Sequence, residues 1–432
     1  MAQKGIDWSS LWKKEDWWSV WMAAVIIILA IGKAITKMPK IGKWTTDPLA
    51  ALAPGTIPLV IMVGLVILVI TIIVISVMKE NVKGYLAGFP LIFILCFLAM
   101  WLAPQKSLSA WGLEHVLWAL IFGLIVSNIF GVPKWLKAAA KTELFIKIGL
   151  VLLGAEILFH TIMKAGALGM TQAIIVVLLV WSFCFWLGRK MGLSDSFGSI
   201  LATGVSVCGV SAAIAAGGAI KGDSKEVSYT ISLVLLCAMP MLVGMPILAK
   251  MMGLSEGVAG AWLGGTIDTT GAVVAAGAIY GKIALEAAAI VKMSQNVLIG
   301  AVAFILAIWF TFKVERKAGE EKPSAAEIWY RFPKFIVGFV IASAVFSLIL
   351  VPSVGEPEVK KILAVTSGFR GWLFALAFVA IGIETRFVDL VKVGGGKPVV
   401  VFLVAQVFNI FLTLALAYLL FGGVLFESPF KG

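Results

Sequence analysis

The sequence predicts an all-α integral membrane protein, and three observations support that fold class. Of the 432 residues, 61% are hydrophobic and only 13% are charged, whereas a soluble protein of this size has about a quarter charged residues. Apolar runs of about 18 or more residues, the length of a membrane-spanning helix, recur along the chain. No polar stretch is long enough to form the core of a separate soluble domain.

The elements follow from these apolar runs in chain order. The tryptophan-rich start, WSSLWKKEDWWSVW, lacks the small-residue cleavage site of a signal peptide and is typical of the membrane interface. About 13 spans follow, each bounded by charged or turn-forming residues. Their predicted ranges are 17–37, 56–78, 85–104, 113–131, 142–163, 171–190, 198–220, 226–250, 258–281, 287–313, 334–353, 364–388 and 397–422.

The longest polar stretch after the first third of the chain, 313–334, is expected to lie on the membrane surface.

The net charge of +12 is explained by the membrane. Most Lys and Arg residues lie in short loops, where they orient helices and contact anionic lipid, so no nucleic-acid partner is expected. More of them lie on the N-terminal side of the predicted spans, which predicts a cytoplasmic N-terminus in the inner (plasma) membrane. All four cysteines lie in apolar segments and the two histidines are isolated, which predicts neither a disulfide nor a metal site.

An internal repeat is visible between two distant segments. GAEILFHTIMKAGALG (154–169) aligns without gaps to GIETRFVDLVKVGGGK (382–397) and pairs Glu156 with Glu384. The two copies lie in predicted spans five and twelve. An odd separation gives them opposite orientations across the membrane, and inverted repeats with discontinuous helices are typical of secondary transporters.

Residues 202–222 are too rich in small residues for a lipid-facing helix. They contain five glycines, each of which weakens a helix by about 1 kcal/mol relative to alanine. We predict a helix break here, after which a half-helix starting near Ser211 points its positive end at an anion. Close helix packing is the alternative, and it is favoured for 213–219. The substrate-binding residues predicted at this break are Ser206, Cys208, Gly209, Val210 and Ser211.

A second candidate break lies in GGTIDTTGAVVAAGAIYG (264–281). Thr266 and Asp268 are predicted to bind a coupling cation or proton, although Asp268 could instead cap a helix. The predicted substrate-binding residues here are Thr269, Thr270 and Gly271, with Asn296 from the next span.

The tail AAGAIYG of this second segment echoes AAGGAIKG in the first. If both segments crossed the membrane they would run parallel, because an even number of spans separates them. Either one of them is re-entrant or they are not repeat partners.

Charged groups at membrane depth are further candidates, since such groups are costly unless they are used. Glu156 and Glu384 are candidates for the coupling-ion site, although a structural Glu–Lys pair is the favoured role for both. Lys147 and Lys292 also lie inside predicted spans. No cofactor is expected apart from a bound Na+.

At these residues the chain resembles the sulfate exporter family, within the superfamily of bile acid, arsenite and riboflavin transporters. The resemblance rests on ATGVSVCGVSAAIAA (202–216), GGTIDTTGAVVAAG (264–277), IVKMSQNVL (290–298) and ALIFGLIVSN (119–128). It implies that residues 85–432 form an inverted-repeat transporter core and that residues 1–84, with the first two spans, are an N-terminal extension. It also implies a carrier with crossed, broken helices, a small-anion substrate and a homodimer.

The chain departs from the family pattern at three places. It has Asp268 and Thr269 where members often have a His–acid pair, Gln295 where many have Arg, and Glu156 where an Arg is frequent. Positive groups are lost and acids are gained, which favours cation coupling or a substrate other than sulfate.

We therefore expect a secondary active transporter of a small anion, such as sulfate, a sulfonate or a carboxylate, coupled to Na+ or H+ and working by alternating access. A cation/proton antiporter of related architecture is the alternative, and a channel with a glycine-rich filter stays open. No enzymatic activity is expected, because paired Asp motifs and Ser/His or Cys/His constellations are absent from the sequence.

Overall fold

The computed structural model describes residues 10–106, 108, 115–157, 159–310, 332–386 and 396–430. These residues form helices and connecting turns, and no β-strand occurs among them. Eight of the described helices are long and apolar enough to cross a membrane, and three shorter apolar helices accompany them. The protein is an all-α, multi-pass membrane protein, as its composition predicts.

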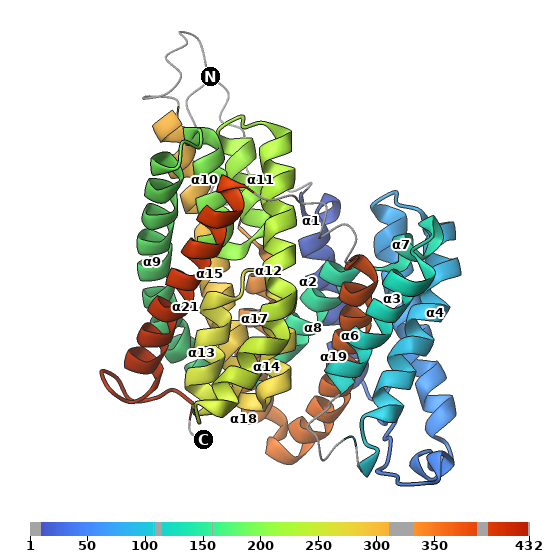
Figure 1. Ribbon diagram of the computed structural model, residues 1–432. Helices are drawn as coiled ribbons and strands as arrows, with labels where there is room; N and C mark the ends of the chain where they lie inside the picture. The colour runs from blue at the N-terminus through green and yellow to red at the C-terminus, as the bar shows by residue number, and fades with distance from the viewer. Residues whose placement is uncertain are drawn as a thin grey trace, which may run out of the picture. The chain divides into compact units, whose positions relative to one another are not determined.

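The elements in chain order are labelled in Figure 1 where there is room. Among those designated η, η1 is a 3₁₀ turn, whereas η2, η3 and η5 are π-helical turns. The bounds are α1 (Ser10–Lys13), α2 (Glu15–Ile31), η1 (Pro48–Ala51), α3 (Thr56–Val77), α4 (Val82–Leu102), α6 (His115–Ile125), η2 (Val126–Phe130), α7 (Lys134–Ala139), α8 (Thr142–Glu156), α9 (Phe159–Lys190), α10 (Asp195–Thr203), η3 (Gly204–Cys208), α11 (Val210–Ala219), α12 (Ser224–Met251), α13 (Glu256–Thr266), α14 (Thr270–Tyr280), α15 (Lys282–Trp309), α17 (Lys334–Ala344), η5 (Val345–Leu350), α18 (Val351–Val354), α19 (Glu356–Glu384) and α21 (Lys397–Phe421).

The chain divides into two compact units. Unit 1 comprises Met1–Phe159 and Lys334–Phe387, and unit 2 comprises His160–Pro333 and Val388–Gly432. Each unit is thus assembled from two separate stretches of the chain.

Unit 1 is a bundle in which α19 packs on α6 and α8, and α8 packs on α17 and α2. Two of these crossings require glycine. A Cβ on Gly382 would lie 2.7 Å from the Cα of Gly123, and a Cβ on Gly154 would lie 2.9 Å from the Cα of Phe339. Gly154 and Gly382 are matched positions of the sequence repeat, so both copies use the glycine for close helix contact. The later repeat positions Phe387, Lys392 and Gly394 lie outside the described residues.

In unit 2, the glycine-rich segment 202–222 belongs to a helical hairpin, which we call hairpin 1 (α10, η3 and α11). Ser194 caps the first arm by accepting a hydrogen bond from Phe197 N at 3.0 Å. The second arm returns to the start of the first, because a Cβ on Gly222 would lie 3.1 Å from Ser196 Oγ. Figure 1 shows α10 and α11 together at one end of the unit.

A second hairpin, hairpin 2 (α13 and α14), enters unit 2 from the opposite end. The Glu256 carboxylate at the start of α13 accepts a hydrogen bond from Ile283 N, just after α14, at 2.7 Å. The hydroxyl of Tyr280 at the end of α14 donates to Leu254 O. The two ends of hairpin 2 therefore lie together, as Figure 1 shows for α13 and α14.

The long helix α12 connects the base of hairpin 1 to the base of hairpin 2, and α15 follows hairpin 2. Unit 2 therefore contains the order hairpin–long helix twice, and the two copies run in opposite directions. The helices are interrupted in 198–220 and 258–281, as predicted, but neither segment runs straight through. Each folds back on itself, with Gly222 close to Ser196 and Ile283 bonded to Glu256. The echoing stretches AAGGAIKG and AAGAIYG are therefore the second arms of two hairpins that enter from opposite ends.

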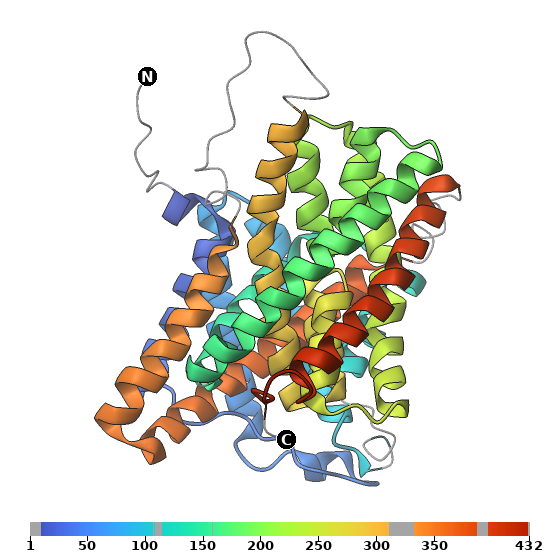
Figure 2. The same ribbon diagram turned by 90° about the vertical axis from the view of Figure 1, so that its left-hand side faces the viewer.

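Helices α9 and α21 lie side by side along one face of unit 2, as Figure 2 shows in green and red. Their contact belongs to a buried cluster that includes Val180 on α9, Leu201 on α10 and Phe402 on α21. This apolar packing holds hairpin 1 against two long helices. The predicted surface stretch 313–334 lies almost entirely outside the described residues.

Candidate functional site

The tips of the two hairpins meet inside unit 2. Gly209 forms the tip of hairpin 1, with φ of 62° and ψ of −107°, a conformation that favours glycine. A Cβ there would lie 3.3 Å from Asp268 Cβ and 3.4 Å from Asp268 O, at the tip of hairpin 2. The two sequence segments that we predicted as breaks are thus in direct contact.

Side-chain amides from α15 and α21 bridge the two tips. Gln295 Nε2 donates to Ser206 O at 2.8 Å on hairpin 1 and to Gly265 O at 3.3 Å on hairpin 2. Asn409 Nδ2 donates at 3.4 Å to both Val205 O and Thr266 O. The carbonyl ends of both first arms, which a helix terminus leaves without partners, are therefore satisfied by side chains from two long helices.

Lys292 brings a cation to the same place. Its Nζ donates to Val207 O and to Gln295 Oε1, both at 2.8 Å, and only 1% of the residue is exposed. A cation is favourable at the carboxyl end of a helix such as the first arm of hairpin 1. The ammonium has three N–H donors, and two of them have these acceptors.

The amino ends of the second arms differ between the hairpins. In hairpin 2, Thr269 Oγ1 accepts a hydrogen bond from Ala272 N at 3.3 Å and caps α14. In hairpin 1 no side chain caps α11, whose N-cap residue is Gly209. Ser211, in the first turn of α11, is exposed. The start of α11 therefore has backbone N–H groups that no side chain caps, at the edge of the buried hairpin tips.

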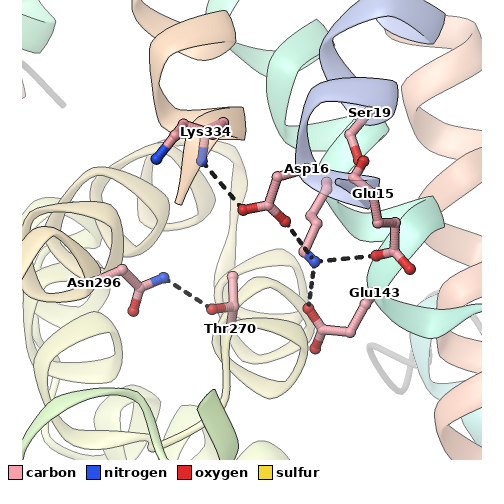
Figure 3. Close-up of polar contacts among 8 residues, drawn as sticks. Glu15, Asp16, Ser19, Glu143, Thr270, Asn296 and Lys334 are labelled. Atoms are coloured by element: carbon pink, nitrogen blue, oxygen red, sulfur yellow. Dashed lines mark hydrogen bonds and ion pairs between the residues drawn. The ribbon is translucent and has the colours of Figure 1, made fainter. Parts of the chain in front are cut away.

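The tip of hairpin 2 is acidic and rich in hydroxyls. Asp268 is 2% exposed and Thr266 is 1% exposed. Gln406 Nε2 donates to Thr266 O at 3.0 Å, and Asn296 Nδ2 donates to Thr270 Oγ1 at 3.1 Å, as Figure 3 shows for Asn296 and Thr270. Helices α15 and α21 therefore each place a carboxamide against the 266–270 turn.

The predicted substrate residues all lie on these two tips or against them. Cys208 is buried in the last position of η3, and Val210 begins α11. Ser206 is buried, and its hydroxyl donates to Ala202 O at 2.7 Å within its own helix. Gly271 is buried in the first turn of α14. No residue of this set falls elsewhere in the fold.

Glu156 and Glu384, predicted for the coupling-ion site, belong instead to unit 1. Glu156 forms a two-contact ion pair with Arg370, with distances of 2.6 Å and 3.2 Å. Glu384 accepts a hydrogen bond from Thr142 Oγ1 at 2.9 Å. For Glu156, the favoured prediction of a structural ion pair was right in kind, but the partner is Arg370 and not a lysine.

Lys147, the other predicted lysine at membrane depth, is held in an acidic cluster of unit 1. Its Nζ lies 2.9 Å from Asp16 Oδ1, 3.1 Å from Glu15 Oε1 and 3.7 Å from Glu143 Oε2. Figure 3 shows these three carboxylates converging on one ammonium. The cluster joins α2 to α8.

We call the two hairpin tips and the side chains that contact them the hairpin junction. Four of these contacting residues were not in the predicted site, although their positions in apolar spans were visible in the sequence. They are Lys292, Gln295, Gln406 and Asn409, which are at most 3% exposed. Polar side chains at membrane depth are the signal for such residues. The sequence does not tell which of them face the same turn.

Comparison with known proteins places the chain in a family. A family profile described as Conserved hypothetical protein 698 matches residues 87–402. A UPF0324 membrane protein of Rhodopirellula baltica is 43% identical over 389 residues, which cover 89% of this chain and 72% of that protein.

Two further relatives have the same printed description. A UPF0324 membrane protein of Nitratidesulfovibrio vulgaris is 40% identical over 354 residues, and the match spans only 61% of its length. Another, from Nitrosomonas europaea, is 29% identical over 446 residues, covering 89% of this chain and 91% of the relative. No solved structure matches the chain.

Proposed function

The chain belongs to the UPF0324 membrane protein family, and from that premise and the geometry of its hairpins we propose that it is a secondary active transporter of a small anion. Sulfate, a sulfonate or a carboxylate is the proposed substrate class, in line with the sulfate exporter resemblance. Coupling to Na+ or H+ and alternating access complete the proposal.

The observation that carries the proposal is the meeting of two oppositely directed hairpins at membrane depth. Helices α12 and α15 have 28 residues each, or about 42 Å at 1.5 Å per residue. The first arm of hairpin 1 has 9 residues in α10 and 5 in η3, and is about 21 Å long. The first arm of hairpin 2 is α13, with 11 residues, and is about 16 Å long. The tips therefore meet near the middle of the long helices, where interrupted backbone is tolerated only inside protein or along a cavity.

An anion fits the start of α11. The N–H groups of an uncapped helix start favour negative charge, and Ser211 adds a hydroxyl on the exposed side. Lys292 brings a positive charge close to this start, because its Nζ donates to the carbonyl oxygen of Val207, three residues before α11 begins. A small anion with two or more oxygens can accept from both sources.

The cation/proton antiporter is the second candidate. It would be favoured by paired carboxylates at the hairpin junction. Within 200–215, 262–272 and 288–300, Asp268 is the one acidic residue in the sequence. A single carboxylate beside a buried lysine fits a coupling site better than the exchange of two cations.

The proposal includes the protein's setting. We place it in the inner (plasma) membrane with the N-terminus in the cytoplasm, on the distribution of Lys and Arg, and as a homodimer, by the resemblance. Its partners are the anion and membrane lipid. It has no enzymatic activity and no resident cofactor other than a coupling ion.

Uptake of labelled sulfate, methanesulfonate and succinate into vesicles containing the purified protein tests this function. We expect uptake of at least one anion under a Na+ or pH gradient, and Lys292→Met should weaken it about 10- to 100-fold, because a hydrogen bond to a charged group contributes about 1.5–3 kcal/mol. Lys250→Met is the matched control, since Lys250 also donates to a helix carbonyl, Ile279 O at 3.1 Å, but at the base of hairpin 2. Absence of uptake of every anion by the wild-type protein would refute the proposal.

A further inference from the structure

We infer that the 266–270 turn of hairpin 2, with the carboxamides of Asn296 and Gln406, is a Na+ site. The ion's ligands are Thr266 Oγ1, Asp268 Oδ2, Asn296 Oδ1 and Gln406 Oε1. The inference deepens the proposed function and relies on it only for the ion's role in transport, since binding can occur without transport.

Four oxygen atoms, two on this turn and two on the carboxamides that contact it, are buried without a hydrogen-bond partner among the described residues. The residues that carry them are 1–3% exposed. A buried polar atom without a partner costs about 1–3 kcal/mol, and few such atoms occur in a folded protein. Two of the four atoms are on the turn, and the other two are on carboxamides that hydrogen-bond to it, so a single cationic ligand would provide the partner that each of them lacks.

The hydrogen bonds of the two carboxamides orient their oxygens. Gln406 Nε2 donates to Thr266 O at 3.0 Å, and Asn296 Nδ2 donates to Thr270 Oγ1 at 3.1 Å. Both amide groups are therefore fixed against the same turn by their nitrogen atoms. Their oxygens are left over as acceptors, as are the hydroxyl of Thr266 and Oδ2 of Asp268.

The chemistry of these atoms points to a hard cation rather than a proton. Carboxylate, carbonyl and hydroxyl oxygens are the ligands that hard cations bind. A proton on Asp268 would provide one donor and could satisfy only one further oxygen. A cation contacts all four oxygens at once, so it removes every unsatisfied acceptor.

The charges favour a monovalent ion. The site holds one carboxylate, Asp268, and Lys292 is near enough to interact with it electrostatically. Their charges cancel, so one monovalent cation and one monovalent anion, such as a sulfonate or a monocarboxylate, can bind together and keep the junction neutral. Na+ fits four oxygens better than K+, which is larger and takes more ligands. The same balance couples cation binding to anion binding.

Thr266→Val is the most informative variant. The replacement removes the hydroxyl and keeps the shape, and this hydroxyl has no hydrogen-bond partner to lose. A purely structural threonine would therefore give a variant that is as stable as the wild type or more stable. Ser199→Ala is the matched control, because Ser199 Oγ on α10 is also buried without a partner.

The measurement is thermal unfolding of the purified full-length protein at increasing NaCl, with choline chloride holding the ionic strength constant and no anion substrate added. We expect the melting temperature of the wild type and of Ser199→Ala to rise with Na+ by mass action. Thr266→Val should need about tenfold or more Na+ for the same rise, and Asp268→Asn should not respond. KCl in place of NaCl should be weaker.

Two results would overturn the site. One is a wild-type protein that Na+ stabilises no better than choline, and the other is a Thr266→Val variant that responds to Na+ as Ser199→Ala does. Vesicle uptake separates this failure from failure of the proposed function. Anion uptake driven by a pH gradient alone would leave the carrier and exclude the Na+ site, whereas Na+ binding without uptake of any anion would leave the site and exclude the carrier.

Discussion

Substitution of Gly209 tests whether the contact of the two hairpin tips is required for function. Gly209 has φ of 62° and ψ of −107°, a region that costs a residue with a side chain about 1–3 kcal/mol. A Cβ would also lie 2.5 Å from Val234 Cγ1 and 3.3 Å from Asp268 Cβ, and such overpacking costs about 1–3 kcal/mol. The two costs together are about 2–6 kcal/mol.

Such a cost is a large part of the stability of a typical folded domain, which is about 5–15 kcal/mol. We therefore expect Gly209→Ala to fold with a displaced tip and a lower melting temperature. Anion uptake should be at least about tenfold slower, because the displaced tip no longer holds the start of α11 in the position where the anion binds. Gly209→Leu should reach the membrane and transport nothing.

Gly218→Ala is the control on the same hairpin. Gly218 lies within α11, and a Cβ there would meet no heavy atom within 4 Å. Alanine is better in a helix by about 1 kcal/mol, so this variant should melt at or above the wild-type temperature and transport normally. If Gly209→Leu transports as well as Gly218→Ala, the hairpin tip is not part of the transport site and the reasoning fails.

Two further predictions concern topology and Glu156. Lys190 and Lys225 are exposed residues on either side of hairpin 1. Lys190→Cys and Lys225→Cys should therefore react with an impermeant maleimide from the same membrane face, whereas the wild type, whose four cysteines are buried, should not react. Labelling from opposite faces would show that the segment crosses the membrane. Glu156→Gln should lower the melting temperature, because a hydrogen bond to a charged group such as those of the partly buried pair with Arg370 contributes about 1.5–3 kcal/mol. The Na+ dependence of stability should stay unchanged, and a lost Na+ response would return Glu156 to the coupling site.

Local composition was enough to locate the candidate site. Small residues around Gly209 and the acid among threonines at Asp268 are unusual in apolar spans, and both proved to be hairpin tips. Their contact could not be predicted, since nothing in either segment specifies the distance between two turns that lie about 60 residues apart. The unexpected partners Gln295 and Asn409 show the same limit, because a single buried amide is compatible with many neighbouring helices.

The sequence also could not tell whether the glycine-rich segments cross the membrane or fold back on themselves. A segment of about 21 apolar and small residues is long enough to cross the membrane and equally long enough to enter and return. The decision depends on the close approach of Gly222 to Ser196 and of Gly281 to Glu256, which are contacts between residues far apart in each segment.

The sequence by itself determined the all-α membrane class, the long spans, and the two segments where the helix is interrupted. It could do so because hydropathy, charge and glycine content act within a single turn or span. Only the tertiary structure decided that both segments are hairpins, that their tips meet, and that Lys292, Gln406 and Asn409 surround them. Those outcomes depend on packing between helices distant in sequence, where shape and the need to pair every buried polar group select one arrangement among many.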